Sequence, residues 1–506
     1  MVRAETARPS AVLSRLRTTR VAFGVLASAL VVGGAIRVWL SLSDDGIYWP
    51  DEIHQSLEPA HRLVYGYGLV AWEFVDGARN WAFPGFVAAL LAIERLVGLS
   101  DPRLYVDATR LVFSAIGIAT ALGTYRLARA YGASSLASAC GAALVALSAP
   151  LIYFAPRALS ETASALPVVF GFALALSPGA GRWQRVAGAS LLGLAVLLRL
   201  QNAIFCAGLL VIFAGRKQWR PALESAAVLA GWAVVYGLVD FLTWGGWYHS
   251  VFTYLGAALS PEWYQWWATH PVGIEPPEYF ARLLWNAMPA AALLTILLSL
   301  AAARRAPGLL ALALAFFLFH SAFPHKELRY VVPVLPIFAA LAAIGFDAVG
   351  AFARRLEAER AADLAWVTPT LSIAVLAAAA FSAAGFHDLT LGQIGQSGPR
   401  NPASSAYDDP GSANRLILAA GKQPDLCGLK IETSHLDMTG GYTYLHRPVP
   451  LYPTDGPSRE SGYFNYAIAF RTANVPGEIR AADGSLVLLR LRPTCVHDDQ
   501  YSWSLR

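Results

Sequence analysis

The feature that most constrains this chain is a succession of long apolar segments whose connections on one side are all basic. The first segment, 21–42, follows an arginine-rich start and is too long for the core of a signal peptide. Only 14% of the residues are charged and 56% are hydrophobic, whereas soluble domains carry about 25% charged residues. In lipid, a continuous apolar run must form a helix because its backbone polar groups have to be satisfied internally. The sequence therefore predicts an all-α polytopic membrane protein.

The basic connections determine on which side each segment begins. Arginine pairs such as Arg126/Arg129 mark the inner side, so the tail 1–20 is expected in the cytoplasm and the loop 43–103 outside. The segment 81–99 is apolar, but crossing there would place Arg126 and Arg129 outside, so we expect an amphipathic helix along the outer interface. About eleven spans follow: 21–42, 104–130, 134–155, 160–178, 186–199, 202–215, 221–243, 284–303, 307–322, 331–350 and 365–386. The short runs 186–199 and 202–215 are expected to meet at 199–202.

Residues 387–506 contain no further span and differ in pattern from the transmembrane domain, 21–386. Gly, Pro, Ser and Asp separate short alternating runs such as 485–491, which is typical of strands. We expect a small extracytoplasmic α/β domain. Cys427 and Cys495 could pair there if the compartment is oxidising, while Cys140 and Cys206 lie in apolar runs as small buried side chains.

Polar residues collect on the outer side, most densely at 48–79. Pro50 suits the first position of a helix, and Asp51 and Glu52 then fall in its first turn. At helical spacing, Asp51, Gln55 and Glu58 share one face. Further polar groups occur at 157–161, 199–202, 244–267 and 325–330. Each has an ordinary structural explanation by itself, but ionisable residues at membrane depth are costly, so their convergence on one face indicates a functional site.

These groups suit glycosyl transfer from a lipid-phosphate sugar. Asp51 is the first candidate for the general base, and Glu52 is the next. The leaving phosphate is already ionised and needs positive charge rather than an acid, which Lys326, Arg329 and Arg199 can provide. One base with one cationic clamp implies a single displacement with inversion. The sequence has no Asp-x-Asp and no glycine-rich phosphate loop, so neither a metal nor another cofactor is expected.

Four stretches resemble a known family. The run PDE-x-x-QSLE-x-x-H at 50–61 and YGYG-x-x-x-WE at 65–73 are similar to the first lumenal loop of glycosyltransferase family 22, the dolichyl-phosphate-mannose-dependent mannosyltransferases. HKELRY at 325–330 resembles its His-Lys-Glu-x-Arg-Phe motif, and 432–452 resembles its C-terminal lumenal segment. The resemblance is nearest to the branch that adds the third mannose of the GPI anchor, and 58–61 is also similar to the lipid-linked-oligosaccharide α-1,2-mannosyltransferase. It implies the GT-C fold, with an outward catalytic loop and interfacial helices.

Carried over residue by residue, the resemblance places the loop acid on Asp51, with Glu52 beside it. The donor phosphate is then expected at Lys326, Arg329, His325 and Arg199. Substrate-binding or orienting roles are expected for the other polar residues of these stretches: Glu327, Gln55, Glu58, His61, Trp72, Glu73 and Arg79. The chain departs from the family at His54, where an aromatic residue is usual, and at Asn80, where the family has serine. Because these changes touch the acceptor side, the family's acceptor is not carried over.

The expected partners are polyprenyl-phosphate-mannose, a glycan or glycolipid acceptor, and membrane lipids. The net charge of +5 comes from arginines beside apolar segments and does not indicate nucleic acid. Scarce lysine and abundant Ala, Arg and Gly fit a high-GC bacterial genome, so the outer face would be periplasmic or extracellular (the ER lumen in a eukaryote). Two alternatives remain, namely another sugar such as arabinose or glucose, and a lipid-linked-sugar flippase. A flippase predicts matching halves and helices interrupted at mid-membrane, and the only interruption lies at 199–202.

Overall fold

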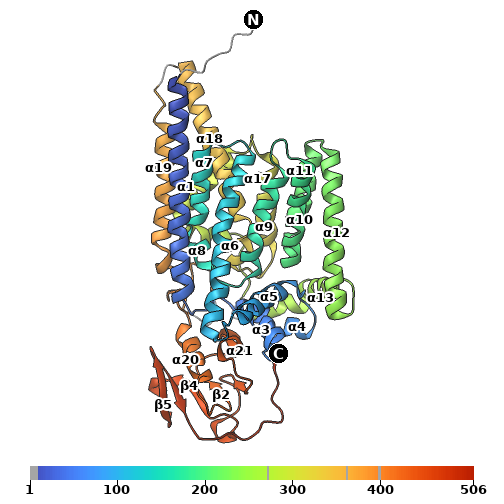
Figure 1. Ribbon diagram of the computed structural model, residues 1–506, viewed down its shortest axis with the longest axis vertical. Coiled ribbons are helices and arrows are strands. Elements are labelled where there is room, and N and C mark those ends of the chain that lie inside the picture. Colours follow the sequence, from blue (N-terminus) through green and yellow to red (C-terminus); the bar gives the residue numbers. More distant parts are fainter. Residues whose placement is uncertain (1–8, 270–272, 361–362, 397–400, 474, 506) are drawn as a thin grey trace.

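The computed structural model describes residues 9–269, 273–360, 363–396, 401–473 and 475–505. Long helices stand side by side in a bundle, and smaller helices and a sheet lie at one end of it (Figure 1). The bundle helices are α1 (Pro9–Ser43), α6 (Pro102–Ala130), α7 (Ser135–Ala146), α9 (Ser160–Ala175), α10 (Arg182–Leu198), α11 (Ala203–Gly215), α12 (Trp219–Trp244), α16 (Pro289–Ala301), α17 (Pro307–Ala322), α18 (Leu335–Arg360) and α19 (Val367–Ala384). The first eight residues of the predicted tail lie outside the described residues.

Five of the described helices are long and apolar enough to cross a membrane, namely α1, α6, α12, α18 and α19. α7, α9, α11, α16 and α17 are apolar but shorter. The helical membrane architecture is thereby confirmed, while the number of spans stays a prediction. The predicted segment 134–155 is divided, because Pro150 lacks a backbone N–H and fits the first turn of a new helix, α8 (Ala149–Phe154).

The connection between α10 and α11 lies where the short apolar runs predicted it. Arg199 has an extended backbone, with φ −153°, and a single 3₁₀ turn over Leu200–Asn202 joins the two helices. The Asn202 side chain donates to the carbonyl of Ala195 at 2.9 Å, which satisfies one of the last carbonyls of α10. This turn fixes Arg199 at the end of the bundle that carries the outer loop.

Short helices cover this end of the bundle. They are α2 (Pro50–Glu52), a π-helical turn (Ile53–Leu57), α3 (Glu58–Tyr65), α4 (Trp72–Val75), α5 (Ala82–Leu96), α13 (His249–Ala258), α14 (Pro261–Thr269) and α15 (Tyr279–Ala287). α5 lies beside α3 and α4, below the bundle helices (Figure 1). It corresponds to the apolar segment that charge placement assigned to the outer interface.

The C-terminal region forms a small α/β unit, as the alternating runs predicted. Its five-stranded sheet has the order β3-β2-β4-β6-β5, with β2 parallel to both neighbours and β6 antiparallel to both of its own. Its elements are α20 (Gly411–Gly421), β2 (Leu429–Ile431), α21 (Gly441–Leu445), β3 (Leu451–Tyr452), β4 (Tyr466–Phe470), β5 (Glu478–Asp483) and β6 (Leu486–Arg490). The strand expected at 485–491 is β6. The boundaries of the predicted domains stay predictions.

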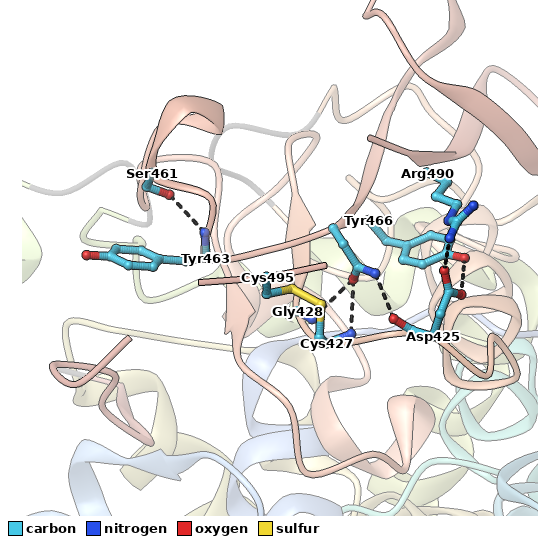
Figure 2. Close-up of a disulfide and its surroundings, with 9 residues drawn as sticks. Asp425, Cys427, Gly428, Ser461, Tyr463, Tyr466, Arg490 and Cys495 are labelled. Carbon is cyan, nitrogen blue, oxygen red and sulfur yellow. Dashed lines mark hydrogen bonds and ion pairs between the residues drawn. A yellow bond between two sulfur atoms is a disulfide. The ribbon is translucent and has the colours of Figure 1, made fainter. Parts of the chain in front are cut away.

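A disulfide cross-links this unit internally, and a pair of short strands joins it to the outer loop. Cys427 and Cys495 form a disulfide (Figure 2). The Asn465 side chain lies beside it, accepting from the Cys427 amide at 3.0 Å and donating to the Asp425 carbonyl at 2.7 Å. The strand β1 (Val70–Ala71) of the outer loop pairs in parallel with β7 (Ser504–Leu505) near the end of the chain. Cys140 is buried and unpaired, as expected.

Candidate active site

The two acidic residues of α2 are adjacent in sequence, but their side chains have different surroundings. Glu52 is buried, and its Oε2 accepts from Arg157 Nη1 at 2.9 Å and from the Tyr48 amide at 3.0 Å. The Asp51 side chain is 19% exposed and is ion-paired with Arg329. Successive helical residues point about 100° apart, so one carboxylate turns into the protein and the other toward the site.

Arg329 connects the outer loop to the HKELRY stretch. Its guanidinium pairs with three carboxylates: with Glu161 at 2.9 Å, with Glu327 at 2.7 Å and with Asp51. Glu161 also pairs with Arg199 at 2.8 Å. We call these five residues the Arg329 cluster. The expected meeting of the acid pair after the first span with the cationic stretch near residue 326 is therefore present, although 278 residues separate Asp51 from Arg329.

Two residues that hold these groups in place were not assigned a role from sequence. Glu161 is fully buried in the first turn of α9, and Arg157 lies just before that helix. Both belong to the polar stretch 157–161. The available signal was an acid in the first turn of an otherwise apolar helix, which is costly there unless it is paired. Its partners come from distant segments and could not be read from spacing.

Burial and neighbouring charges set the protonation of the site. Burial raises the pKa of Asp51, although the charge of Arg329 opposes this. Burial also raises the pKa of Glu73 to about 7, and the charge of Asp51 adds to the effect. Burial alone would raise the pKa of Glu327, but the charge of Arg329 and the bond to His325 at 3.0 Å outweigh it, so that pKa is lowered. Asp51 and Glu73 therefore hold a proton more readily than exposed carboxyl groups do, whereas Glu327 stays ionised.

The other predicted binding residues form contacts of their own. The Lys326 ammonium donates to the carbonyl of Glu275 at 2.6 Å and to that of Phe323. Gln55 donates to Glu73 at 2.7 Å. The Trp72 ring lies 5.3 Å from that of Trp263 between centroids, at an interplanar angle of 49°.

Glu58 and His61 do not face the Arg329 cluster, so the expectation that Asp51, Gln55 and Glu58 share one face is wrong. Glu58 is buried, and accepts from the Leu69 amide at 2.8 Å and from the amide and hydroxyl of Thr443. His61 is also buried and hydrogen-bonds His446 at 3.0 Å. The cause is the π-helical turn at Ile53–Leu57, whose wider winding displaces later side chains from the 3.6-residue period. Both side chains therefore contact the C-terminal region.

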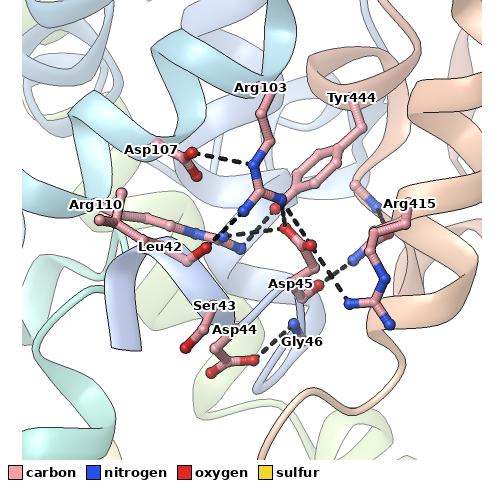
Figure 3. A network of polar contacts seen from close by, with 12 residues as sticks. Leu42, Ser43, Asp44, Asp45, Gly46, Arg103, Asp107, Arg110, Arg415 and Tyr444 are labelled. Carbon is pink, nitrogen blue, oxygen red and sulfur yellow. Dashed lines mark hydrogen bonds and ion pairs between the residues drawn. The ribbon is translucent and has the colours of Figure 1, made fainter. Parts of the chain in front are cut away.

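A second group of charges lies around Asp45, earlier in the same loop (Figure 3). The Asp45 carboxylate is 2% exposed and pairs with Arg103, with Arg110 at 3.3 Å and with Arg415 at 3.4 Å. Arg415 also pairs with Asp408 at 2.8 Å. We call these five residues the Asp45 network. Because Arg415 belongs to α20 and Arg103 and Arg110 to α6, the network fixes the C-terminal region to the bundle.

A cleft adjoins the Arg329 cluster. Its lining includes Gln55, Arg79, Arg199, Gln201 and Tyr254 together with apolar residues of α4, α5 and α10. Tyr254 belongs to α13, and its hydroxyl accepts from Gln201 at 3.1 Å. Because Arg199 also belongs to the Arg329 cluster, the cleft adjoins that cluster and extends to Tyr254 on α13.

The sequence is similar to known mannosyltransferases. Residues 28–394 match the model of the Alg9-like mannosyltransferase family. GPI mannosyltransferase 3 of Yarrowia lipolytica is 31% identical over 333 residues, which is 63% of this chain and 62% of that protein. GPI alpha-1,2-mannosyltransferase 3 of Xenopus laevis is 26% identical over 339 residues, 64% of this chain and 61% of that protein. The chain thus spans less than two thirds of the length of these two relatives.

The fold is also similar to a solved structure. ArnT from Cupriavidus metallidurans, crystallised with undecaprenyl phosphate bound, superposes with a TM-score of 0.57. The alignment covers 92% of this chain and 97% of ArnT at 16% sequence identity. At that identity the likeness concerns the fold, which is the GT-C fold.

Proposed function

Because this chain belongs to the Alg9-like mannosyltransferase family, we propose that it is a membrane-bound mannosyltransferase that uses a polyprenyl-phosphate-mannose donor. The acceptor is proposed to be a hydroxyl of a glycan or glycolipid at the extracytoplasmic face. The GT-C fold supports this proposal, and so does the similarity to an enzyme whose structure contains undecaprenyl phosphate. Transfer of another sugar from the same kind of lipid is the alternative, because sugar identity depends on a few pocket contacts.

One observation carries the proposal, namely the exposure of Asp51. The side chain of Asp51 is 19% exposed, whereas those of Glu161 and Glu327 in the same cluster are 0% and 4% exposed. Its neighbour Glu52 is also 4% exposed and is paired with Arg157. A general base must reach the proton that it removes. Of these four carboxylates, Asp51 is the one that an acceptor hydroxyl can approach, which favours Asp51 over Glu52 as the base.

The proposed reaction is a single displacement. The acceptor oxygen attacks the anomeric carbon and gives its proton to the Asp51 carboxylate. The bond from that carbon to the phosphate oxygen breaks, and the electron pair leaves with the polyprenyl phosphate. Arg329 holds the carboxylate in place, and its charge opposes the rise in the pKa of Asp51 that burial causes. Attack opposite the leaving group inverts the anomeric centre.

The test compares Asp51→Asn with Asp76→Asn in membranes supplied with radiolabelled polyprenyl-phosphate-mannose, followed by mass analysis of the product. Asp76 is an exposed carboxylate of the same outer loop and serves as the matched control. We expect Asp51→Asn to lower the transfer rate by about 10²- to 10⁴-fold, the usual contribution of a general base. Asp76→Asn should transfer at the wild-type rate. Wild-type transfer by Asp51→Asn would remove Asp51 from the role, and label entering the product only from a nucleotide sugar would contradict the donor.

A further inference from the structure

The positive groups nearest Asp51 already have partners. Arg329 is paired with three carboxylates, and the Lys326 ammonium is bonded to two backbone carbonyls. Within the Arg329 cluster, two guanidinium groups face three carboxylates. A phosphate placed on Arg329 would face these carboxylates and would have to displace existing buried ion pairs, which is unfavourable. Arg329 and Lys326 are therefore arranged to hold neighbouring groups rather than to receive another anion.

Arg79 is the exception. Within the described residues, its guanidinium forms no hydrogen bond or ion pair, and its Nε is buried without a partner. The charges of Glu73 and Asp51 act on it and raise the pKa of Arg79 against the effect of burial, and the centroid of the Tyr254 ring lies 5.6 Å from Cζ. A guanidinium is always charged in proteins, and leaving its N–H groups partly buried without a hydrogen-bond acceptor is unfavourable. This arrangement is expected where an anionic ligand completes the site.

The backbone beside this free guanidinium is held firmly. The Arg79 carbonyl accepts from Trp244 Nε1 at 3.0 Å, and the side chain of Asn80 donates to Asp240 at 2.7 Å. Asp240 is fully buried in α12 and also accepts from the amide and hydroxyl of Ser250 in α13. An acid inside a membrane helix is costly. Here it ties the 79–80 segment to α12 and α13, so the position of Arg79 does not depend on its own side chain.

Arg199 lines the same cleft. One of its Nη atoms pairs with Glu161, but its Nε is buried and has no partner. The cleft therefore presents two guanidinium groups from separate segments, each with at least one unused buried donor. Guanidinium groups bind phosphate oxygens well because their N–H groups form a planar fork.

We propose that Arg79, together with Arg199, binds the phosphate of the lipid-linked donor in this cleft, and that Arg329 and Lys326 are positioning residues. The inference rests on the proposed function, since the donor is the lipid phosphate named there. The donor phosphodiester carries one negative charge, and the departing polyprenyl phosphate approaches two. Contacts from two arginines strengthen as this charge develops, so they stabilise the transition state more than the bound donor.

The test measures binding of undecaprenyl phosphate and of undecaprenol to the purified protein in phosphatidylcholine nanodiscs. The difference between the two ligands reports the phosphate contact alone. We expect Arg79→Gln to weaken the binding of undecaprenyl phosphate about 10- to 100-fold, the range for a lost charged hydrogen bond. The binding of undecaprenol should not change. Arg79→Lys should lose less affinity for undecaprenyl phosphate than Arg79→Gln does. The matched control is Arg282→Gln, whose side chain is 52% exposed on α15, and it should bind like the wild type.

Each other outcome is decisive. If the wild type shows no preference for undecaprenyl phosphate over undecaprenol, the donor in the proposed function is wrong. If the wild type shows the preference and Arg79→Gln keeps it, only the present inference is wrong. Competition by inorganic phosphate or by phosphatidylglycerol at equal concentration would show a general anion site and overturn it too. Failure of Arg79→Gln to fold would contradict it as well, because an unpaired side chain should not be needed for folding.

Discussion

Two groups of charged residues share the first outer loop, yet they differ in what they leave open. In the Asp45 network, Asp45 is 2% exposed and takes ion pairs from three arginines of two distant helices. In the Arg329 cluster, Asp51 remains 19% exposed, and beside it lies a cleft with an unpaired arginine. The buried ion pairs of the Asp45 network join the C-terminal region to the bundle. The Arg329 cluster and its cleft instead have an accessible carboxylate and N–H donors without partners, which are features of a substrate-binding site.

The largest expected effect separates the two aspartates by stability. Asp45→Asn leaves Arg103, Arg110 and Arg415 without their shared carboxylate, so we expect it to lower the free energy of unfolding by about 3–5 kcal/mol. Asp51→Asn should change it by less than about 1 kcal/mol, because Arg329 keeps two other carboxylates. Thermal melts of the detergent-purified variants measure both. Equal destabilisation by the two substitutions would show that the groups do not differ as described.

The second expected effect is a loss of transfer activity at low pH, caused by protonation of Asp51. Asp51 must be ionised to accept a proton, so activity is present above its pKa and falls about tenfold for each unit below it. Burial raises the pKa of Asp51 above its usual value, and it raises the pKa of Glu73 to about 7. The loss of activity should therefore begin at a higher pH than an exposed aspartate would give. The measurement is kcat/KM for transfer between pH 5 and 8.5. Glu73→Gln should make the acidic limb shallower, and a flat wild-type profile down to pH 5.5 would contradict the assignment.

Much of this arrangement follows from the sequence, because the number of apolar segments and the position of the basic loops predict on which side of the membrane each loop lies. Arginine placement put the PDE and HKELRY stretches on one face, and the ion pair between Asp51 and Arg329 agrees with that. The interruption at Arg199 was predicted from two apolar runs too short to span comfortably. Both inferences use properties that a linear pattern retains, namely charge, length and order.

The sequence could not predict how tightly the helix after Glu52 is wound, or which charged side chains pair with one another. The turn at Ile53–Leu57 is π-helical, and nothing in its composition distinguishes it from an α-helical turn, so helical spacing predicts the wrong face for Glu58. The predicted phosphate role of Lys326 could not be weighed against its bonds to the carbonyls of Glu275 and Phe323, which depend on a distant backbone segment. The isolation of Arg79 is equally a tertiary property, because an unpaired arginine looks like any other in a sequence.

The smallest expected effect tests where the energy of the Asp45 network resides. Asp107 pairs only with Arg103 among the described residues, at 3.0 Å and one helical turn away, and the two side chains are 17% and 30% exposed. Asp107→Asn should therefore cost less than about 1 kcal/mol, the usual range for partly exposed pairs in a helix. Arg103 keeps its pair with Asp45, which the substitution does not touch. The same melts measure this cost, and a double-mutant cycle with Arg103→Gln isolates the coupling between the two side chains. A cost as large as that of Asp45→Asn would mean that the stabilising charge is spread along α6 instead of concentrated on the one buried carboxylate where α6 and α20 meet.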